Sequence, residues 1–257
     1  MHFVNTTPTL KKEVKAYMLK DFVKESLEVT DELHDDNYYS FNVDPNMIMQ
    51  VDKDWHNFTD YLAAMKTKFR VKAKKAMERS SYLETINITE DNLAVYINEM
   101  KRLYDNVSSK ADFNLGKYNL NTFSDLKKNL KDNYIIKGYL LNNQMVGFLS
   151  GMITQNNLDA HFVGIDYKYN KEYAVYQRIL YDYIQIAISK KIKLINFGRT
   201  ASEIKSSVGA IPQDLTIYLR HKKSIPNKFL RLLLTNFEAT PFSQKTPFKA
   251  KELVIKN

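Results

Sequence analysis

Apolar and polar positions alternate along this chain with two periods, one typical of strands and one typical of helices. Near the N-terminus a period of two predicts short strands at residues 13–22, 38–43 and 46–51. Asp44-Pro45 is a natural turn between the last two strands. Residues 23–34, which lie between the first two, fit a helix.

A helical period follows over residues 58–80, where apolar side chains recur on one face. Asn57 or Thr59 can cap this helix at its start. Between Lys66 and Arg79 it carries seven basic residues and one acidic residue. Such a charge run usually forms a solvated face, and the alternative is a contact with RNA phosphates or anionic lipid.

The middle of the chain predicts a mixture of both element types. In order, the sequence indicates a strand at 82–88, helices at 89–107 and 123–130, and strands at 133–141 and 144–154. Thr89 is the expected N-cap of the longer helix, because acidic residues follow it in the first turn. Asn142-Asn143 joins the two strands in a typical hairpin sequence.

A strand–helix–strand unit then spans 158–198. The strand at 158–165 is followed by an amphipathic helix over 170–191 and an apolar strand at 193–198. We expect the two strands to be parallel neighbours that diverge at their carboxyl ends and form a ligand crevice there. A short helix at 200–207, a strand at 214–220 and a helix at 226–236 complete a mixed α/β fold.

Composition and charge narrow the classes of protein. The chain has 257 residues and no cysteine, which excludes disulfides, thiol nucleophiles and cysteine-ligated metal sites. Its net charge of +9 favours an anionic partner, namely nucleic acid, a membrane surface or a phosphorylated cofactor. The apolar run from Met145 is too short to span a bilayer, and no signal-peptide core is visible, so we expect a cytoplasmic protein without membrane insertion.

Three stretches, "KDF" at 20–22, "DYLAAMKTKFRVKAKKA" and "FGRTASEIKSSVGAIP", resemble the FemAB-like, peptidoglycan-biosynthesis branch of the GNAT acyltransferases. The resemblance implies a GNAT-like fold, with residues 1–88 as a partial first unit that includes the basic helix 58–80, and residues 89–257 as a GNAT-like domain. The usual glycine-containing pyrophosphate loop is absent, and "DYKYNKEYAV" stands in its place.

This resemblance also implies an activity, the transfer of an acyl or aminoacyl group to an amine. The donor would be acyl-CoA or aminoacyl-tRNA, with tRNA contacting the basic helix. The acceptor would be a small molecule or a cell-wall precursor of a bacterial cell. Two alternatives stay open: a catalytically silent GNAT-like binding module, and a basic nucleic-acid-binding protein.

Charged residues cluster where the strand at 193–198 ends. Arg199 can hold an anionic group there, with Lys205 as a second substrate-binding residue, and Glu203 can act as a general base. The alternative for Arg199 and Glu203 is an ordinary surface ion pair. His161, inside the strand at 158–165, is a candidate proton shuttle or a packed structural residue.

The start of the long helix is a candidate cofactor site. If the helix opens at residues 171–173, its backbone N–H groups can bind phosphate. The candidate cofactor-binding residues are Lys168, Lys171, Glu172 and Tyr173. The acidic stretch at 31–36 has no repeated ligand spacing, so we expect no metal site.

Overall fold

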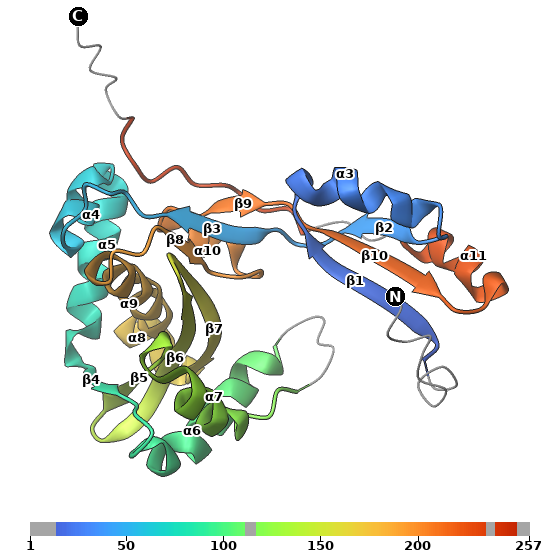
Figure 1. Cartoon of the computed structure of the whole chain (residues 1–257). Helices are drawn as coiled ribbons and strands as arrows, with labels where there is room; N and C mark the ends of the chain where they lie inside the picture. Colours follow the sequence, from blue (N-terminus) through green and yellow to red (C-terminus); the bar gives the residue numbers. More distant parts are fainter. Residues whose placement is uncertain (1–13, 111–116, 235–239, 251–257) are drawn as a thin grey trace, which may run out of the picture. The chain divides into compact units, whose positions relative to one another are not determined.

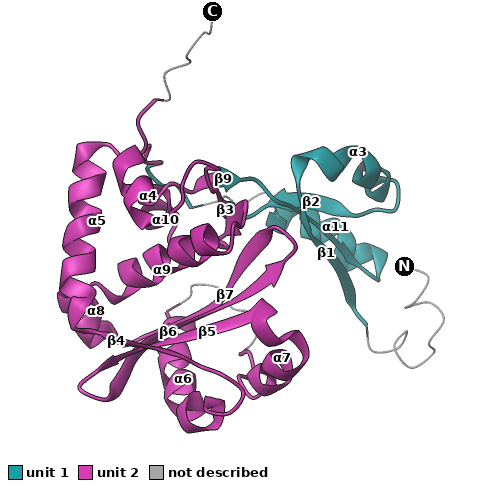
Figure 2. Ribbon diagram, turned by 60° about the vertical axis from the view of Figure 1, so that its left-hand side comes forward, with its two compact units in different colours: residues 1–46, 212–243 teal, residues 47–211, 244–257 magenta. Residues whose placement is uncertain are grey.

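The chain forms two compact units. The computed structural model describes residues 14–110, 117–234 and 240–250 (Figure 1). One unit combines residues 1–46 with 212–243, and the other combines 47–211 with 244–257 (Figure 2). Residues 47–88 therefore pack in the same unit as 89–211. The relation of residues 1–88 to a first GNAT-like unit stays a prediction.

The smaller unit is a three-stranded antiparallel sheet with a helical layer. Its strands are β1 (Ala16–Phe22), β10 (Thr216–His221) and β2 (Tyr39–Asn42), in that order. The segment predicted as a helix at 23–34 forms three short helical pieces, η1 (Lys24–Ser26), α3 (Leu27–Thr30) and η2 (Asp31–His34). Helix α11 (Ser224–Leu234) packs on β10 and β2.

The larger unit contains most of a seven-stranded mixed sheet. In spatial order the strands are β4 (Glu84–Asn87), β5 (Tyr134–Leu141), β6 (Gln144–Thr154), β7 (Asn157–Ile165), β8 (Leu194–Asn196), β3 (Asn46–Gln50) and β9 (Ile211–Gln213). Asn142 and Asn143 both have positive φ angles, 50° and 65°, and join β5 to β6 as the predicted hairpin. Strands β7 and β8 are parallel.

Helices cover both faces of this sheet. Phe148 on β6 packs against Phe123 of α7 (Thr122–Leu130), next to α6 (Leu93–Ser108). The preceding residue, Gly147, lies against Val175 of α9 (Val175–Ser189). Because successive strand residues point to opposite faces, α6 and α7 cover one face and α9 the other.

Three expectations about helix boundaries are wrong. The helix expected at 58–80 is two helices, α4 (Phe58–Ala64) and α5 (Thr67–Arg79), because Met65 turns extended and forms a bridge with Phe248. Asn57 does cap α4, in a capping box with Asp60. The N-cap of α6 is Asn92 rather than Thr89, because the helix begins at Leu93; Asn92 makes no side-chain cap bond, and its side chain accepts from the Thr89 amide instead.

The third is the long helix expected at 170–191. It is interrupted at Ala174, which has the left-handed conformation, φ 50° and ψ 38°. The interruption separates α8 (Tyr167–Tyr173) from α9. The sequence gives no sign of it, because alanine is the best helix former of all the residues.

Candidate functional site

The parallel pair β7–β8 is joined only at its amino end. The paired residues are Asn157 with Leu194, Leu158 with Ile195, and Asp159 with Asn196. Beside the last of these pairs, the side-chain amide of Asn196 donates to the Asp159 carboxylate at 3.0 Å. Strand β7 continues to Ile165 while β8 has ended, so within the described residues no strand pairs with that edge of β7 after Asp159. The predicted parallel neighbours are confirmed.

A β-bulge lies in β7 directly after the last pair with β8. The register with β6 shifts between Leu149–Val163 and Gly151–Ala160, so that His161 and Phe162 both lie opposite Ser150. The Ser150 hydroxyl compensates for the interrupted ladder. It accepts from the Phe162 amide and donates to the Phe162 carbonyl, each at 3.0 Å. On the other side of the sheet, Tyr183 of α9 donates to the Ser150 carbonyl at 2.7 Å.

Strict alternation along β7 would put His161 and Phe162 on opposite faces of the sheet, and the bulge changes this. His161 and Phe162 are adjacent in sequence, yet both rings contact Tyr118, at 5.3 and 4.6 Å between centroids. They therefore point toward the same face, the one covered by α6 and α7. The added residue in a bulge, which puts two residues opposite one, explains this.

His161 is held in a largely aromatic pocket. Its Nδ1 lies 3.0 Å from the Tyr134 hydroxyl, and the rings of Tyr118 and Phe123 are close to it. Burial lowers the pKa of His161 to about 4, so the imidazole is neutral at pH 7. Burial also raises the pKa of Tyr134, which keeps that phenol protonated. A neutral imidazole in such a place can accept a proton or serve as a packed structural group.

A tight turn follows β8. Gly198 has a φ of 71°, a conformation that favours glycine, and its amide donates to the Asn196 side chain at 2.9 Å. Phe197 is buried and packs against Tyr183. Helix α10 (Ser202–Ser207) begins after Ala201, which has no side-chain cap. Neither the Thr200 nor the Ser202 side chain caps this helix.

Lys205 lies beneath this turn. Its side chain is buried, with an exposed fraction of 4%. Its Nζ donates to the carbonyls of Gly198 at 3.1 Å and Arg199 at 2.6 Å. Burial lowers the pKa of Lys205 to about 7. The contacts make Lys205 a support for the turn, and its direct contact with a substrate stays a prediction.

The turn gathers two further residues singled out from the sequence. Glu203 is exposed on α10 and forms an ion pair with Lys245 at 2.8 Å. Arg199 is partly buried, and this lowers the pKa of its guanidinium. Lys205 donates to the Arg199 carbonyl and so fixes the backbone at this residue. The roles of Glu203 as a base and Arg199 as an anion contact stay predictions.

The amides of residues 171–173 do not open a helix. Asp166 caps the start of α8 by accepting from the Lys168 amide at 3.1 Å, and residues 171–173 form its last turn. Arg102 pairs with Asp166 at 3.1 Å. The argument for a phosphate site at 171–173 is therefore wrong.

The side chains proposed for cofactor binding stay together on α8. The Lys168 ammonium lies over the Tyr169 ring, the Tyr173 ring lies beside those of Tyr82 and Tyr169, and the Glu172 carbonyl accepts from Arg79 at 2.7 Å. Lys171 lies in the same last turn. No contact joins them to His161 or Lys205 among the interactions of the described residues, and their cofactor role stays a prediction.

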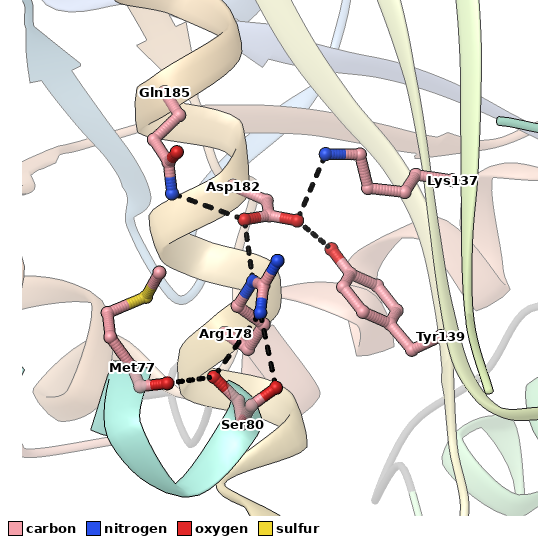
Figure 3. Close-up of polar contacts among 7 residues, drawn as sticks. All are labelled: Met77, Ser80, Lys137, Tyr139, Arg178, Asp182 and Gln185. Atoms are coloured by element: carbon pink, nitrogen blue, oxygen red, sulfur yellow. Dashed lines mark hydrogen bonds and ion pairs between the residues drawn. The ribbon is translucent and has the colours of Figure 1, made fainter. Parts of the chain in front are cut away.

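A buried carboxylate was not singled out from the sequence. Asp182 of α9 is 1% exposed and accepts four hydrogen bonds (Figure 3). The donors are Lys137 at 3.1 Å, Tyr139 at 2.9 Å, Arg178 at 2.8 Å and Gln185 at 3.3 Å. Arg178 also donates to the Ser80 carbonyl, so the cluster joins α9 to β5 and to η3 (Ser80–Tyr82). The sequence did contain one signal of this cluster, because Asp182 lies among the apolar positions of the helix predicted at 170–191.

Comparison with known proteins identifies the fold as GNAT-like. A GCN5-related N-acetyltransferase from Sphaerobacter thermophilus is similar over 80% of this chain and 60% of its own, with 7% identity and a TM-score of 0.50. L-PGS from Bacillus licheniformis is similar over 88% and 75%, with 12% identity and a TM-score of 0.59. FemX is similar over 91% and 78%, with 10% identity and a TM-score of 0.55. The GNAT-like fold expected from the sequence is confirmed.

Sequence comparison adds no closer relationship. No protein-family model matches the sequence, and no curated protein matches it either. At identities this low, the structural similarity defines the fold alone.

Proposed function

We propose that the larger unit transfers an acyl or aminoacyl group to an amine where β7 leaves β8. The observation that carries this proposal is the end of β7–β8 pairing at Asp159 and Asn196, followed at once by the bulge at His161 and Phe162. Past that point the β7 edge has backbone groups that no described strand pairs. Such groups are suited to stabilise negative charge on a reacting carbonyl oxygen.

In the proposed reaction the amine attacks the carbonyl carbon of the donor and a C–N bond forms. Backbone N–H groups of β7 stabilise the tetrahedral oxyanion. The oxyanion then collapses, and the C–S bond of a thioester or the C–O bond of an aminoacyl ester breaks. Neutral His161 relays the proton that the amine loses to the departing sulfur or oxygen, so that a thiol or an alcohol leaves.

The turn after β8 has a binding role in this proposal. Arg199 holds an anionic group of the donor or acceptor through a charge-assisted contact. Lys205 positions Arg199 by fixing the carbonyls of Gly198 and Arg199. The acceptor is a small-molecule amine or a cell-wall precursor.

The start of α8 bears on the choice of donor. A pyrophosphate is bound best by open helix N–H groups, but here the Asp166 carboxylate occupies that place. This favours aminoacyl-tRNA over acyl-CoA as the donor. It also supports the second candidate function, a GNAT-like module that binds a ligand without catalysis.

Ligand-linked stability and product formation together test the proposal. A donor at a hundred times its dissociation constant should stabilise the fold by about 2.7 kcal/mol. We would measure unfolding with CoA, acetyl-CoA and aminoacyl-tRNA, then transfer to amines by mass spectrometry. Stabilisation without transfer would favour the binding module, and neither effect with any donor would refute the proposal.

Variants at Arg199 and His161 assign the roles. Arg199→Ala should weaken binding roughly tenfold to a hundredfold, and Arg199→Lys should rescue it only in part, because lysine cannot form the planar fork. His161→Ala should lower the rate more than the affinity. Exposed Val95→Ser on α6 is the matched control and should change neither. Normal binding by both Arg199 variants would leave Arg199 with a structural role.

A further inference from the structure

Helix α11 of the smaller unit presents large apolar side chains to solvent. These are Ile225, Phe229, Leu232 and Leu233, with exposed fractions of 71%, 60%, 65% and 62%. Their spacing is that of a single helical stripe, about 100° wide at 100° per residue. A solvated helix normally turns polar residues outward, so this stripe is unusual.

The opposite face of α11 is fixed to the rest of the smaller unit. Asn227 and Leu234 are buried there, with exposed fractions of 5% and 9%. The Asn227 side chain accepts from the His221 amide at 2.7 Å and donates to the Asn37 carbonyl at 2.9 Å. These bonds set the rotation of the helix, and the apolar stripe therefore faces outward.

Cations lie along one side of the stripe and before its start. Lys223 precedes the helix, Lys228 and Arg231 lie on one flank, and all three are exposed. The sequence has no aspartate or glutamate between Asp214 and Glu238. An apolar face with only basic charge beside it is the pattern of a helix that lies in the plane of a membrane surface.

We propose that the exposed face of α11 docks on an anionic lipid surface, with its apolar stripe among the acyl chains and its cations on the head groups. Charge complementarity favours lipid over a second copy of the chain. Two copies meeting through this stripe would bring Lys228 and Arg231 close to the same cations of the partner. The helix lies on the surface and does not cross it, since no helix in the described ranges is long and apolar enough to span a bilayer.

Vesicle sedimentation of the full chain tests the proposal. Phosphatidylcholine vesicles with phosphatidylserine should bind the protein, and pure phosphatidylcholine should bind it much less. Phe229→Ser with Leu233→Ser should lower the partition coefficient at least about tenfold, because two large side chains no longer leave water. Lys228→Ala with Arg231→Ala should lower it by roughly tenfold or more and flatten its salt dependence.

Two matched controls separate α11 from other surfaces. Val71→Ser with Val95→Ser removes exposed apolar side chains from α5 and α6. Lys68→Ala with Lys72→Ala removes charge from the basic helix α5. Both control variants should bind phosphatidylserine vesicles normally. Losses in the controls as large as those in the α11 variants would overturn the assignment to α11.

A fluorescence probe locates the contact. Trp55 is the only tryptophan, so Phe229→Trp in a Trp55→Phe background reports on the stripe alone. Its emission should shift to the blue with phosphatidylserine vesicles. Vesicle binding without that shift, or no vesicle binding at all, would refute the proposal. A dimer in sedimentation velocity that Phe229→Ser dissociates would also refute it, in favour of a second copy.

Discussion

The ammonium of Lys205 exchanges water for two backbone carbonyls at the turn after β8. Desolvation penalises its charged form, and this is why the pKa of Lys205 falls to about 7 in the folded chain. In the unfolded chain a lysine has a pKa near 10.4. The difference makes the stability of this turn sensitive to alkaline pH.

We expect the unfolding free energy of the wild type to increase with pH more steeply than that of the Lys205→Met variant. Between about pH 7 and 10 the unfolded chain binds a proton that the folded chain lacks, so stability rises by up to about 1.4 kcal/mol per pH unit. This gain is complete above the unfolded pKa and is lost as the pH falls through the folded pKa. Urea unfolding from pH 7 to 9.5 measures it, and parallel curves for the two proteins would contradict it.

The sequence identified the position of this turn but not the environment of its side chains. Three charges within seven residues after an apolar strand pointed to Arg199, Glu203 and Lys205. Burial of Lys205 could not be foreseen, because a lysine is almost never buried without a partner and its partners here are carbonyls. The Glu203 partner, Lys245, is distant in sequence and belongs to a segment without a periodic pattern.

At the scale of elements, the bulge in β7 depends on one hydroxyl. Ser150 is fully buried and satisfies both the amide and the carbonyl of Phe162. Ser150→Ala leaves those groups without that partner, so we expect a loss of about 1–3 kcal/mol in the unfolding free energy. Denaturant unfolding measures the loss, with exposed Ser189→Ala as the control. Equal effects of the two substitutions would mean that the hydroxyl does not support the bulge.

The Asp182 cluster links helix α9 to β5 and η3 through charge. Asp182→Asn keeps the shape but leaves Lys137 and Arg178 without the buried carboxylate. We expect a loss of about 3–5 kcal/mol, the usual cost of breaking a buried pair from one side. Thermal and urea unfolding measure it, and Asp105→Asn in the exposed pair with Lys117 should cost at most about 1 kcal/mol. A small loss for Asp182→Asn would show that water reaches the cluster.

Periodicity predicted most strands and helices, but not where helices break. The two interruptions, at Met65 and Ala174, involve residues that favour helices. Met65 leaves the helix to pair with Phe248, far along the chain. The bulge at His161 likewise arises from pairing with β6, so a strict period of two placed its neighbour on the wrong face. Tertiary contacts account for the positions of Met65 and His161.

At the scale of the whole molecule, residues 212–243 belong to the same compact unit as residues 1–46. Strand β10 lies between β1 and β2, so the smaller unit needs residues from both parts of the chain. The sequence predicted each of these strands but not their common sheet, because nothing local encodes a pairing between residues so distant. The predicted division at residue 88 cuts the sequence once, whereas each compact unit combines two separate segments of the chain.

Tyr218 provides a test of how separately the two units unfold. It lies at the centre of the smaller unit, 1% exposed, with its hydroxyl 2.8 Å from Thr30 and its ring against Phe22 and His34. Removing so large a buried ring should cost the smaller unit about 3–5 kcal/mol. Each unit has its own core, so we expect Tyr218→Ala to unfold the smaller unit early and to leave the larger one intact.

The single tryptophan makes this prediction measurable. Trp55 belongs to the larger unit, where its ring packs on Tyr61 and Phe248 at 5.2 and 5.3 Å. In Tyr218→Ala, urea unfolding followed by far-ultraviolet circular dichroism should show a new early transition, while the midpoint of Trp55 fluorescence stays where it is in the wild type. Tyr218→Phe, which keeps the ring and loses only the hydroxyl, should shift the early transition much less. If the fluorescence midpoint falls together with the dichroism midpoint, the two units unfold as one cooperative structure.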